Sequence, residues 1–418
     1  MSSISPDIIV DIATLSAELQ RFAEFTDAPA PAVTRVMLSD TDLVARRYLL
    51  ELFQAAGLKV RIDGAGNIFA RWEGEDKDLP AVATGSHTDA IPNAGLYDGT
   101  VGVLGGLEAI RALQRAGVRP RRSIELIMFT SEEPTRYGVG CLGSRLMSGI
   151  MSAEAASKLT DSDGVTFGQL SDRASGADEL SEVQLKPGAY QAFVELHIEQ
   201  GPLLEQAGLP IGVVTAIAAP ASLRVTYEGS GGHAGAVLMA DRRDALLPAA
   251  KLALAVDSAA RTLGGADTVA TTGVLDILPR AINSIPNRTY LEIDVRDIDH
   301  ERRDRVLNHI CEQAKMLGDE HRQKATVELI NADPPAVCSS EIVAAIESAS
   351  AAANQQSKRM ISRAYHDSLF MAQLCPTAMI FIPCRNGYSH RPDEYASPDA
   401  IAAGVQVLAG TLARLAAI

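Results

Sequence analysis

Histidine and carboxylate side chains recur in this sequence at the ends of apolar runs. Five of the eight histidines stand there beside glycine, aspartate or glutamate: His87, His197, His233, His366 and His390. The remaining three lie in a polar helical segment, where a solvated surface explains them: His300, His309 and His321. Ligands of open α/β sheets collect beyond the carboxyl ends of the strands, so side chains at several such ends converge. One such histidine is usually satisfied by a backbone carbonyl, but several together indicate a metal site.

Imidazole and carboxylate ligands without thiolate suit Zn²⁺, Mn²⁺ or Co²⁺. The candidate ligands are His87, Asp98, His197, His390 and the adjacent Glu132 and Glu133. Two ions about 3.5–4 Å apart share a ligand, and Asp98 is the best candidate for this bridging carboxylate. One of the adjacent glutamates would bind metal, and the other would take a proton from a water molecule. Asp89, two residues after His87, is placed to orient that imidazole.

The elements that must position these side chains indicate an α/β domain. Helical periodicity is clear in residues 42–56, 101–116, 341–353 and 398–416. Short apolar runs, typical of buried parallel strands, occur at 81–85, 124–130, 193–198 and 378–383. The predicted fold is therefore α/β, a catalytic domain with a mostly parallel sheet and helices on both faces.

The interval 215–331 has a different pattern. Apolar and polar residues alternate there, as in strands covered on one face only, and helical stretches occur at 241–262 and 300–317. We therefore predict a smaller α+β domain inserted into the catalytic domain. The predicted parts are 1–214 and 332–418 for the catalytic domain and 215–331 for the insertion. Residues 151–190, rich in Ala, Ser, Asp and Gly, indicate a surface excursion.

Composition restricts the partners and the compartment. A formal net charge of −14 over 418 residues argues against binding to nucleic acid or anionic membranes. The sequence has no apolar run of about 18 residues and no basic-then-apolar N-terminal region, so neither a membrane span nor a secretory signal is expected. Its five cysteines form no CxxC pair, which predicts free thiols and a cytoplasmic protein.

Taken in order, several motifs resemble the binuclear-metal amidohydrolases of the M20 metallopeptidase superfamily. They are "GSHTDAIPNAGLYDG", "FTSEEPTRYG", "ELHIEQGPLLE", "GGHAGAVLM", "NSIPN", "LEIDVR" and "GYSHRPDE". The most similar branch is the ureido hydrolases, which act on N-carbamoyl-L-amino acids, allantoate or ureidoglycolate. Within it, "TSEEPTR", "HAGAVLM", "AINSIP" and "ISRAYHDSLFMA" look most like ureidoglycolate amidohydrolase. The other two classes usually have Gly-Ala-Gly where this chain has Arg363-Ala364-Tyr365.

The resemblance implies a role for each candidate residue. His87 and His197 would bind one ion, and Glu133 and His390 the other. Asp98 would bridge the two ions, and Glu132 would be the general base. The inserted domain would act as a lid and form a homodimer.

The same resemblance implies substrate contacts. His233 would stabilise the oxyanion in its own or the partner subunit's active site. The substrate's polar end would be held by Gln200, Asn283 and Arg296. From the residues alone, a solvated charged ladder explains Arg296 equally well. For His366, a hinge role, a place behind the ligands and a substrate contact all stay open.

The implied activity is hydrolysis of the ureido C–N bond of a small ureido acid, with release of ammonia and carbon dioxide. The first expectation is conversion of (S)-ureidoglycolate to glyoxylate in purine (allantoin) breakdown. The alternative is an N-carbamoyl-L-amino-acid hydrolase or an allantoate amidohydrolase. A catalytically inactive metal-binding relative would be expected to lack Glu132 or a ligand, and none is missing. The implied cofactors are two divalent ions per subunit, Mn²⁺ or Zn²⁺, with Co²⁺ or Ni²⁺ as substitutes in vitro.

Overall fold

The computed structural model describes residues 8–174, 176 and 178–417. The chain divides into two compact units. The first comprises Met1–Thr215, Cys338–Ser362 and His366–Ile418. The second comprises Ala216–Val337 together with the three residues Arg363–Tyr365. Three residues from the later part of the sequence therefore pack with the inserted segment.

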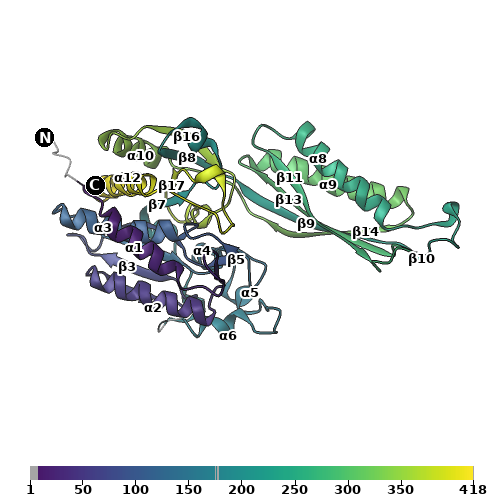
Figure 1. Cartoon of the computed structure of the whole chain (residues 1–418), viewed down its shortest axis with the longest axis horizontal. Helices are drawn as coiled ribbons and strands as arrows, with labels where there is room; N and C mark the ends of the chain where they lie inside the picture. Colours follow the sequence, from purple (N-terminus) through teal and green to yellow (C-terminus); the bar gives the residue numbers. More distant parts are fainter. Residues whose placement is uncertain (1–7, 175, 177, 418) are drawn as a thin grey trace. The chain divides into compact units, whose positions relative to one another are not determined.

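The first unit is built on a mixed β-sheet (Figure 1). Its strands are β2 (Lys59–Ile62), β3 (Ile68–Trp72), β4 (Ala81–His87), β6 (Ile124–Phe129), β7 (Tyr190–Ile198), β8 (Ile211–Ile217), β16 (Ser357–Ser362) and β17 (Thr377–Ile382). The order is β8-β17-β7-β4-β6-β3-β2, with β16 beside β8. β17, β7, β4 and β6 are parallel, whereas β3, β2 and β8 pair antiparallel. The parallel part is confined to the centre because β2 and β3 follow each other through a short turn, which only antiparallel neighbours allow.

Smaller pairings complete this part of the chain. β1 (Val33–Arg35) pairs antiparallel with β5 (Ala90–Ala94), and β15 (Ala336–Val337) pairs with the last residues of β8. The first pairing matters for the site, because β5 begins just after the end of β4.

Helices cover both faces of the main sheet. They are α1 (Ile12–Ala23), α2 (Asp40–Ala55), α3 (Thr100–Arg115), α4 (Leu142–Ser148), α7 (Leu203–Ala207), α10 (Ser340–Ala352), α11 (Asp367–Met371) and α12 (Pro398–Ala416). Successive side chains of a strand point to opposite faces, and β7 illustrates this. Leu196 packs on the glycines Gly105 of α3 and Gly404 of α12. The ring of the next residue, His197, instead lies 4.5 Å from the ring of His366, the N-cap of α11.

The long predicted helices and the central strands are confirmed. The periodic stretches correspond to α2, α3, α10 and α12, and the apolar runs to β4, β6, β7 and β17. Ser397 caps α12 by accepting the N–H of Ala400, and Pro398 follows at the first helical position. α12 is also long and apolar enough to span a membrane, but 67% of its apolar window is buried in the protein, as in a core helix.

The predicted surface excursion at 151–190 is wrong in part. It contains α5 (Ala153–Ser157), α6 (Phe167–Ser171) and the 3₁₀ turn η1 (Leu180–Glu182). Phe167, Leu170 and Val183 are buried in a hydrophobic cluster that also contains Phe129 and Phe193. Because these apolar residues are few and widely spaced, they form no visible period, and the polar composition dominates the sequence pattern.

The second unit is an antiparallel sheet with two helices on one face. Its strands are β9 (Ala219–Glu228), β11 (Val269–Leu278), β13 (Arg288–Asp297) and β14 (Lys324–Ala332), in the order β11-β13-β9-β14. The helices α8 (Leu246–Leu263) and α9 (His300–Glu320) pack on this sheet. Leu291, Ile293 and Val295 of β13 are buried beneath them, whereas the residues between are partly exposed. This alternation is the one that the sequence predicts for half-covered strands. A short pair of strands, β10 (Gly232–His233) and β12 (Ser284–Ile285), lies outside the sheet.

Candidate metal centre

Two strand ends bring His87 and His197 to Asp98. His87 is the last residue of β4, and His197 is the last but one of the parallel strand β7. Asp98 lies just before α3. Oδ1 of Asp98 is 3.5 Å from Nε2 of His87 and 3.2 Å from Nε2 of His197. All three side chains are buried, and their ligand atoms lie close enough together to hold one metal ion.

Backbone contacts decide which ring nitrogen of each histidine faces Asp98. Nδ1 of His87 is 3.0 Å from the carbonyl oxygen of Asp89, and Nδ1 of His197 is 2.9 Å from that of Ile198. A carbonyl oxygen only accepts, so each Nδ1 carries a hydrogen. Each Nε2 faces Asp98 and is the atom that would bind a metal ion once its own proton is displaced, which is the arrangement that metal-binding histidines require.

A second group of ligands meets the other oxygen of Asp98. Nε2 of His390 is 3.2 Å from Oδ2 of Asp98 and 3.2 Å from Oε1 of Glu133. These three residues also lie within reach of one ion. Asp98 thus divides its two oxygens between two ligand groups, as a bridging carboxylate does.

Asp89 holds the adjacent glutamates in place. Its Oδ1 accepts the backbone N–H of Glu132, and its Oδ2 accepts that of Glu133, both at 3.1 Å. Ser131 has a left-handed backbone conformation with φ of 60°, which ends the strand direction of β6 just before the two glutamates. Asp89 also contacts His87: its carbonyl oxygen lies 3.0 Å and its Oδ1 3.6 Å from Nδ1 of that ring. The predicted role of Asp89 in orienting His87 stays a prediction.

Glu132 points to the first ligand group. Its Oε2 is 3.7 Å from Nε2 of His87, and its Oε1 is 3.6 Å from the thiol Sγ of Cys141. Burial raises the pKa of the Glu132 carboxyl well above its usual range; the His87 imidazole opposes this shift, while the neighbouring Glu133 carboxylate adds to it. A buried carboxyl that binds a proton readily, beside a metal-ligand cluster, suits a general base.

The electrostatics of the cluster favour a cation. Burial alone would lower the pKa of His87, but the carboxylates of Glu132, Asp89 and Asp98 raise it well above its usual range. For His390, hydrogen bonds to Asp98 and then to Glu133 raise the pKa to about 11. The carboxylates of the cluster therefore carry more negative charge than the neighbouring histidines balance. A negatively charged group of nitrogen and oxygen donors fits a divalent ion of the Mn²⁺ or Zn²⁺ type.

Gln200 and Ser389 also reach Asp98. The side-chain Nε2 of Gln200 donates to Oδ2 of Asp98 at 2.8 Å, and the hydroxyl of Ser389 donates to the same oxygen at 2.6 Å. Oε1 of Gln200 is buried and has no hydrogen-bond partner among the described residues. Gln200 is thus at the site as predicted, although its role toward a substrate stays a prediction.

Sequence reasoning missed several supporting residues, and Arg35 is the clearest. Its buried guanidinium donates to the carbonyl oxygen of Thr88, between His87 and Asp89, at 2.8 Å. Burial lowers the pKa of Arg35 to about 10, and nearby carboxylates, including Asp89, oppose this shift. No local pattern distinguishes this arginine from a surface one. Its role comes from the pairing of β1 with β5.

Sequence reasoning also missed Glu394 and left the role of His366 open. Glu394 accepts the backbone N–H groups of Tyr97 and Asp98. It lies within the quoted "GYSHRPDE" motif, but a carboxylate in a charged loop usually faces water. His366 is buried behind His197, with Nε2 3.1 Å from the hydroxyl of Ser362. This position fits a residue that supports the candidate ligand His197 better than one that contacts the substrate.

His366 also belongs to a third cluster that could hold an ion, with Glu195 and His197. The carboxylate of Glu195 already accepts the hydroxyl of Ser86 at 2.7 Å. It also accepts both the hydroxyl and the backbone N–H of Ser368. These donors occupy the carboxylate, so the two groups around Asp98 are the stronger candidates.

The remaining predicted substrate residues lie in the second unit. His233 on β10 pairs with Ser284 of β12, and the N–H of Ala234 donates to the carbonyl oxygen of Asn283. His233 and Asn283 are therefore neighbours. Arg296 lies near the far end of β13, where it forms an ion pair with Asp294. The roles of these residues toward the metal centre stay predictions.

The family of the chain follows from a comparison with known proteins. Residues 83–414 match the model of "Peptidase family M20/M25/M40". The chain belongs to this family. The resemblance predicted from the motifs is thereby confirmed, including the expectation of a hydrolase. Metal dependence is a property of the family, and the ligand groups around Asp98 accord with it.

The similar proteins include ureido hydrolases. A ureidoglycolate hydrolase of Arabidopsis thaliana is 53% identical over 99% of this chain and 88% of its own length. An N-carbamoyl-L-amino acid amidohydrolase of Geobacillus stearothermophilus is 36% identical over 95% of this chain and 97% of its own. The crystal structure of AtUAH in complex with glyoxylate matches with a TM-score of 0.90 and 52% identity, over 99% of both chains. The predicted resemblance to ureidoglycolate hydrolases is thus confirmed.

Proposed function

We propose that the chain is a two-metal amidohydrolase and that it cleaves the ureido C–N bond of (S)-ureidoglycolate, in purine (allantoin) breakdown. This proposal rests on the position of the two carboxylate oxygens of Asp98. Oδ1 faces His87 and His197, whereas Oδ2 faces His390. The similarity to ureidoglycolate hydrolase over nearly the whole chain supports the substrate.

We assign one ion to each of the two ligand groups. His87 and His197 would hold one ion, Glu133 and His390 the other, and Asp98 both. We propose Mn²⁺ or Zn²⁺, because these nitrogen and oxygen donors accept either. When bound, the ions polarise the ureido carbonyl and lower the pKa of a water molecule.

Glu132 would move the proton. Its carboxylate accepts a proton from the attacking water and returns it to the leaving nitrogen. The high pKa of the buried carboxyl supports a residue that carries a proton for part of the cycle. Asp89 keeps the Glu132 backbone fixed during both transfers.

The overall reaction balances with one water. Water adds to the ureido carbon, the C–N bond breaks, and ammonia leaves together with an unstable carbamate that loses carbon dioxide. The remaining hydroxyglycine releases a second ammonia and becomes glyoxylate. One ureidoglycolate and one water therefore give one glyoxylate, one carbon dioxide and two ammonia.

Three further residues would hold the substrate. The unpartnered Oε1 of Gln200 can accept a hydrogen bond from a ureido N–H. The guanidinium of Arg296 recognises a carboxylate through two parallel hydrogen bonds, and ureido acids carry one. Asn283 would add a hydrogen bond to the polar end of the substrate.

We infer that the protein is a homodimer, in which His233 and Asn283 serve the partner subunit's active site. β13 separates Arg288, close to Asn283, from Arg296 by a distance on the order of 25 Å. A small ureido acid cannot touch both ends of this strand. If Arg296 holds the substrate in its own subunit, His233 is left to stabilise the oxyanion in the partner's site.

The exposed side of the second unit supports the same association. β11 is an edge strand of ten residues whose outer backbone groups face no neighbouring strand of the described sheet. Leu254 of α8, which packs over β11, is 75% exposed, and Leu247 and Leu275 are also exposed. An unpaired edge beside apolar side chains is a surface that a second copy can cover.

We also propose the cytoplasm as the compartment. The five cysteines are all free, and Cys141, Cys338, Cys375 and Cys384 are buried. Unpaired thiols in this number fit a reducing environment.

The test is ammonia release by metal-stripped protein reconstituted with Mn²⁺ or Zn²⁺. The substrates are ureidoglycolate, allantoate, N-carbamoyl-β-alanine and several N-carbamoyl-L-amino acids. A strong preference for ureidoglycolate, with glyoxylate as product, is the expected result. A preference for a carbamoyl amino acid would keep the mechanism and replace the substrate. No ammonia from any ureido acid, with ions bound, would contradict the proposed reaction.

A further inference from the structure

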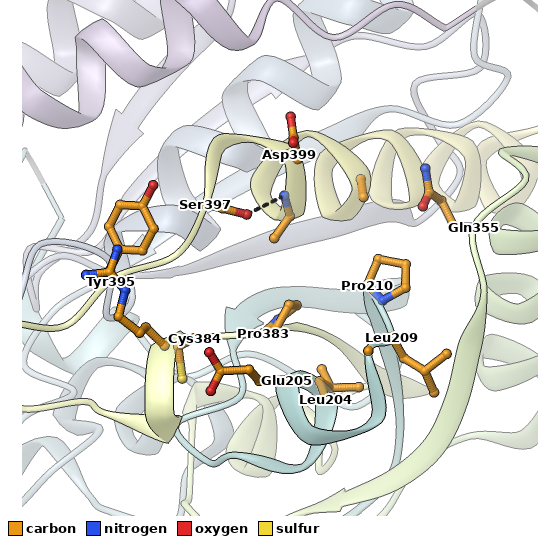
Figure 2. A pocket seen from close by; sticks show the side chains of 14 residues that line it. Leu204, Glu205, Leu209, Pro210, Gln355, Pro383, Cys384, Tyr395, Ser397 and Asp399 are labelled. Atoms are coloured by element: carbon orange, nitrogen blue, oxygen red, sulfur yellow. Dashed lines mark hydrogen bonds between the residues drawn. The ribbon is translucent and has the colours of Figure 1, made fainter.

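The loop between β17 and α12 lies beside a pocket. A cavity of about 520 Å³ opens behind it (Figure 2). The loop contributes both of its ends to the lining, with Pro383, Cys384, Arg385, Tyr395 and Ser397. The guanidinium of Arg385 stacks on the ring of Tyr395 and closes the neck of the loop. The middle of the loop, which carries Ser389 and His390, does not line this pocket and is joined to Asp98 by hydrogen bonds.

Glu394 supplies these bonds from within the loop. Its Oε1 accepts the backbone N–H of Tyr97 at 2.7 Å and that of Asp98 at 3.0 Å. Its Oε2 lies 3.0 Å from the hydroxyl oxygen of Ser389. Gly95 makes room for this contact, since a Cβ there would lie 2.3 Å from Cβ of Glu394. One buried carboxylate therefore joins the backbone of the bridging aspartate to the loop that carries His390.

The hydroxyl of Ser389 lies between two carboxylates. Its Oγ is 2.6 Å from Oδ2 of Asp98 and 3.0 Å from Oε2 of Glu394. A hydroxyl has one hydrogen and donates it to one acceptor at a time. Oδ2 of Asp98 is also the oxygen next to His390. A cation at that oxygen competes with the hydroxyl, and Glu394 offers the hydroxyl another acceptor.

We propose that Glu394 is a positioning residue for the second ion, the one assigned to Glu133 and His390. It fixes Asp98 and the loop relative to each other, and it takes up the Ser389 hydroxyl when Oδ2 of Asp98 binds a cation. His87 and His197 belong to strands of the sheet, so the first ion depends less on this loop. The inference rests on the proposed two-ion centre.

The experiment measures metal stoichiometry and affinity instead of turnover. Metal-free protein is titrated with Mn²⁺ by calorimetry, and bound manganese is counted after dialysis. Wild-type protein should bind two ions per chain. Glu394→Ala should keep the first ion at near wild-type affinity and bind the second about 10- to 100-fold more weakly, the usual effect of removing a support of a metal ligand. Glu394→Gln should lie between them, because its amide oxygen still accepts the two N–H groups.

Asp63→Ala is the matched control. Asp63 is also a buried carboxylate that accepts two backbone N–H groups, those of Ala65 and Asn67, in the turn between β2 and β3. Its replacement should lower the melting temperature and leave both manganese affinities unchanged. Loss of ions in this control as well would mean that general destabilisation explains the result, which would overturn the role of Glu394.

The outcomes separate the inference from the function on which it rests. Two ions with unchanged affinity in Glu394→Ala would overturn the positioning role and leave the two-ion centre intact. Equal weakening of both ions would also overturn it. Fewer than two ions in wild-type protein would overturn the two-ion centre itself. If the alanine variant does not fold, Glu394→Gln decides: second-ion affinity equal to that of wild type would contradict the proposal.

Discussion

Glu132 and Glu133 are adjacent in sequence, yet they face different partners. Glu133 meets His390, whereas Glu132 meets His87 and the thiol of Cys141. Regular strand geometry would send adjacent side chains to opposite faces of the sheet. The left-handed Ser131 and the two hydrogen bonds that Asp89 accepts from the glutamate backbone instead let both glutamates reach one centre.

Replacing Glu132 by Gln should separate metal binding from turnover. Glutamine keeps the size of the side chain and removes the base, so the rate should fall by about 10²- to 10⁴-fold. The metal content should stay at the wild-type value, because Glu132 is not among the assigned ligands. Ammonia release and manganese content of the same sample check both expectations. Retained activity would remove Glu132 from the role of base.

Metal binding should release protons at neutral pH. The pKa of His390 is raised to about 11 by Asp98 and Glu133, so the ring is protonated in the metal-free protein. A metal ion displaces that proton, and its affinity should therefore rise with pH. Calorimetry in two buffers of different ionisation enthalpy measures the number released. No buffer dependence would contradict a protonated His390.

The same shift has a defined sign for the stability of the metal-free protein. The folded-state pKa lies above the ordinary value of 6.5, so folding favours the protonated ring. This contribution is fully present below pH 6.5 and is lost as the pH rises toward 11. Thermal unfolding of metal-free protein against pH should show the decline on the alkaline side.

At the scale of elements, the glycines of α12 set how closely it packs on the sheet. A Cβ at Gly404 would lie 2.5 Å from Cγ2 of Ile382 and 2.9 Å from Cδ1 of Leu196. Gly404→Ala gains up to about 1 kcal/mol in helix propensity, but overpacking typically costs about 1–3 kcal/mol. The variant should therefore be less stable in urea unfolding. Gly410→Ala, where the nearest atom is 3.3 Å away, should instead be as stable as wild type or slightly more stable, because little overpacking offsets the gain in helix propensity.

The strands that could be predicted from the sequence are those that are buried along their whole length. β4, β6, β7 and β17 are fully buried or nearly so, and each appears as an uninterrupted apolar run. Their carboxyl ends then led to the candidate ligands. Glu394 and Arg35 were not predictable, because their roles come from contacts across long stretches of chain, and neither lies in a periodic pattern. α6 was missed for a related reason, since only its folded neighbours reveal that Phe167 is buried.

For the whole molecule, the second unit carries the surface that we assign to the dimer. Leu254→Glu should convert the protein to a monomer, because a charge would replace the most exposed leucine beside β11. Leu329→Glu is the control, since Leu329 is 55% exposed on β14 at the opposite edge of the sheet. Sedimentation velocity distinguishes the two. A monomeric wild-type protein, or a dimer in both variants, would contradict this surface.

The segment Arg363–Tyr365 packs with the second unit although it follows β16 of the first. Arg363 pairs with Asp267 at 2.9 Å, and the ring of Tyr365 lies beneath the guanidinium of Arg296. Two stretches of chain that are far apart in the sequence thus belong to one compact unit. A chimera that exchanges only residues 216–337 with a carbamoylase would leave Asp267 and Arg296 facing a Gly-Ala-Gly segment. If Arg296 holds the substrate, we therefore expect that a transplant of substrate preference between such enzymes must include the tripeptide as well as the insertion.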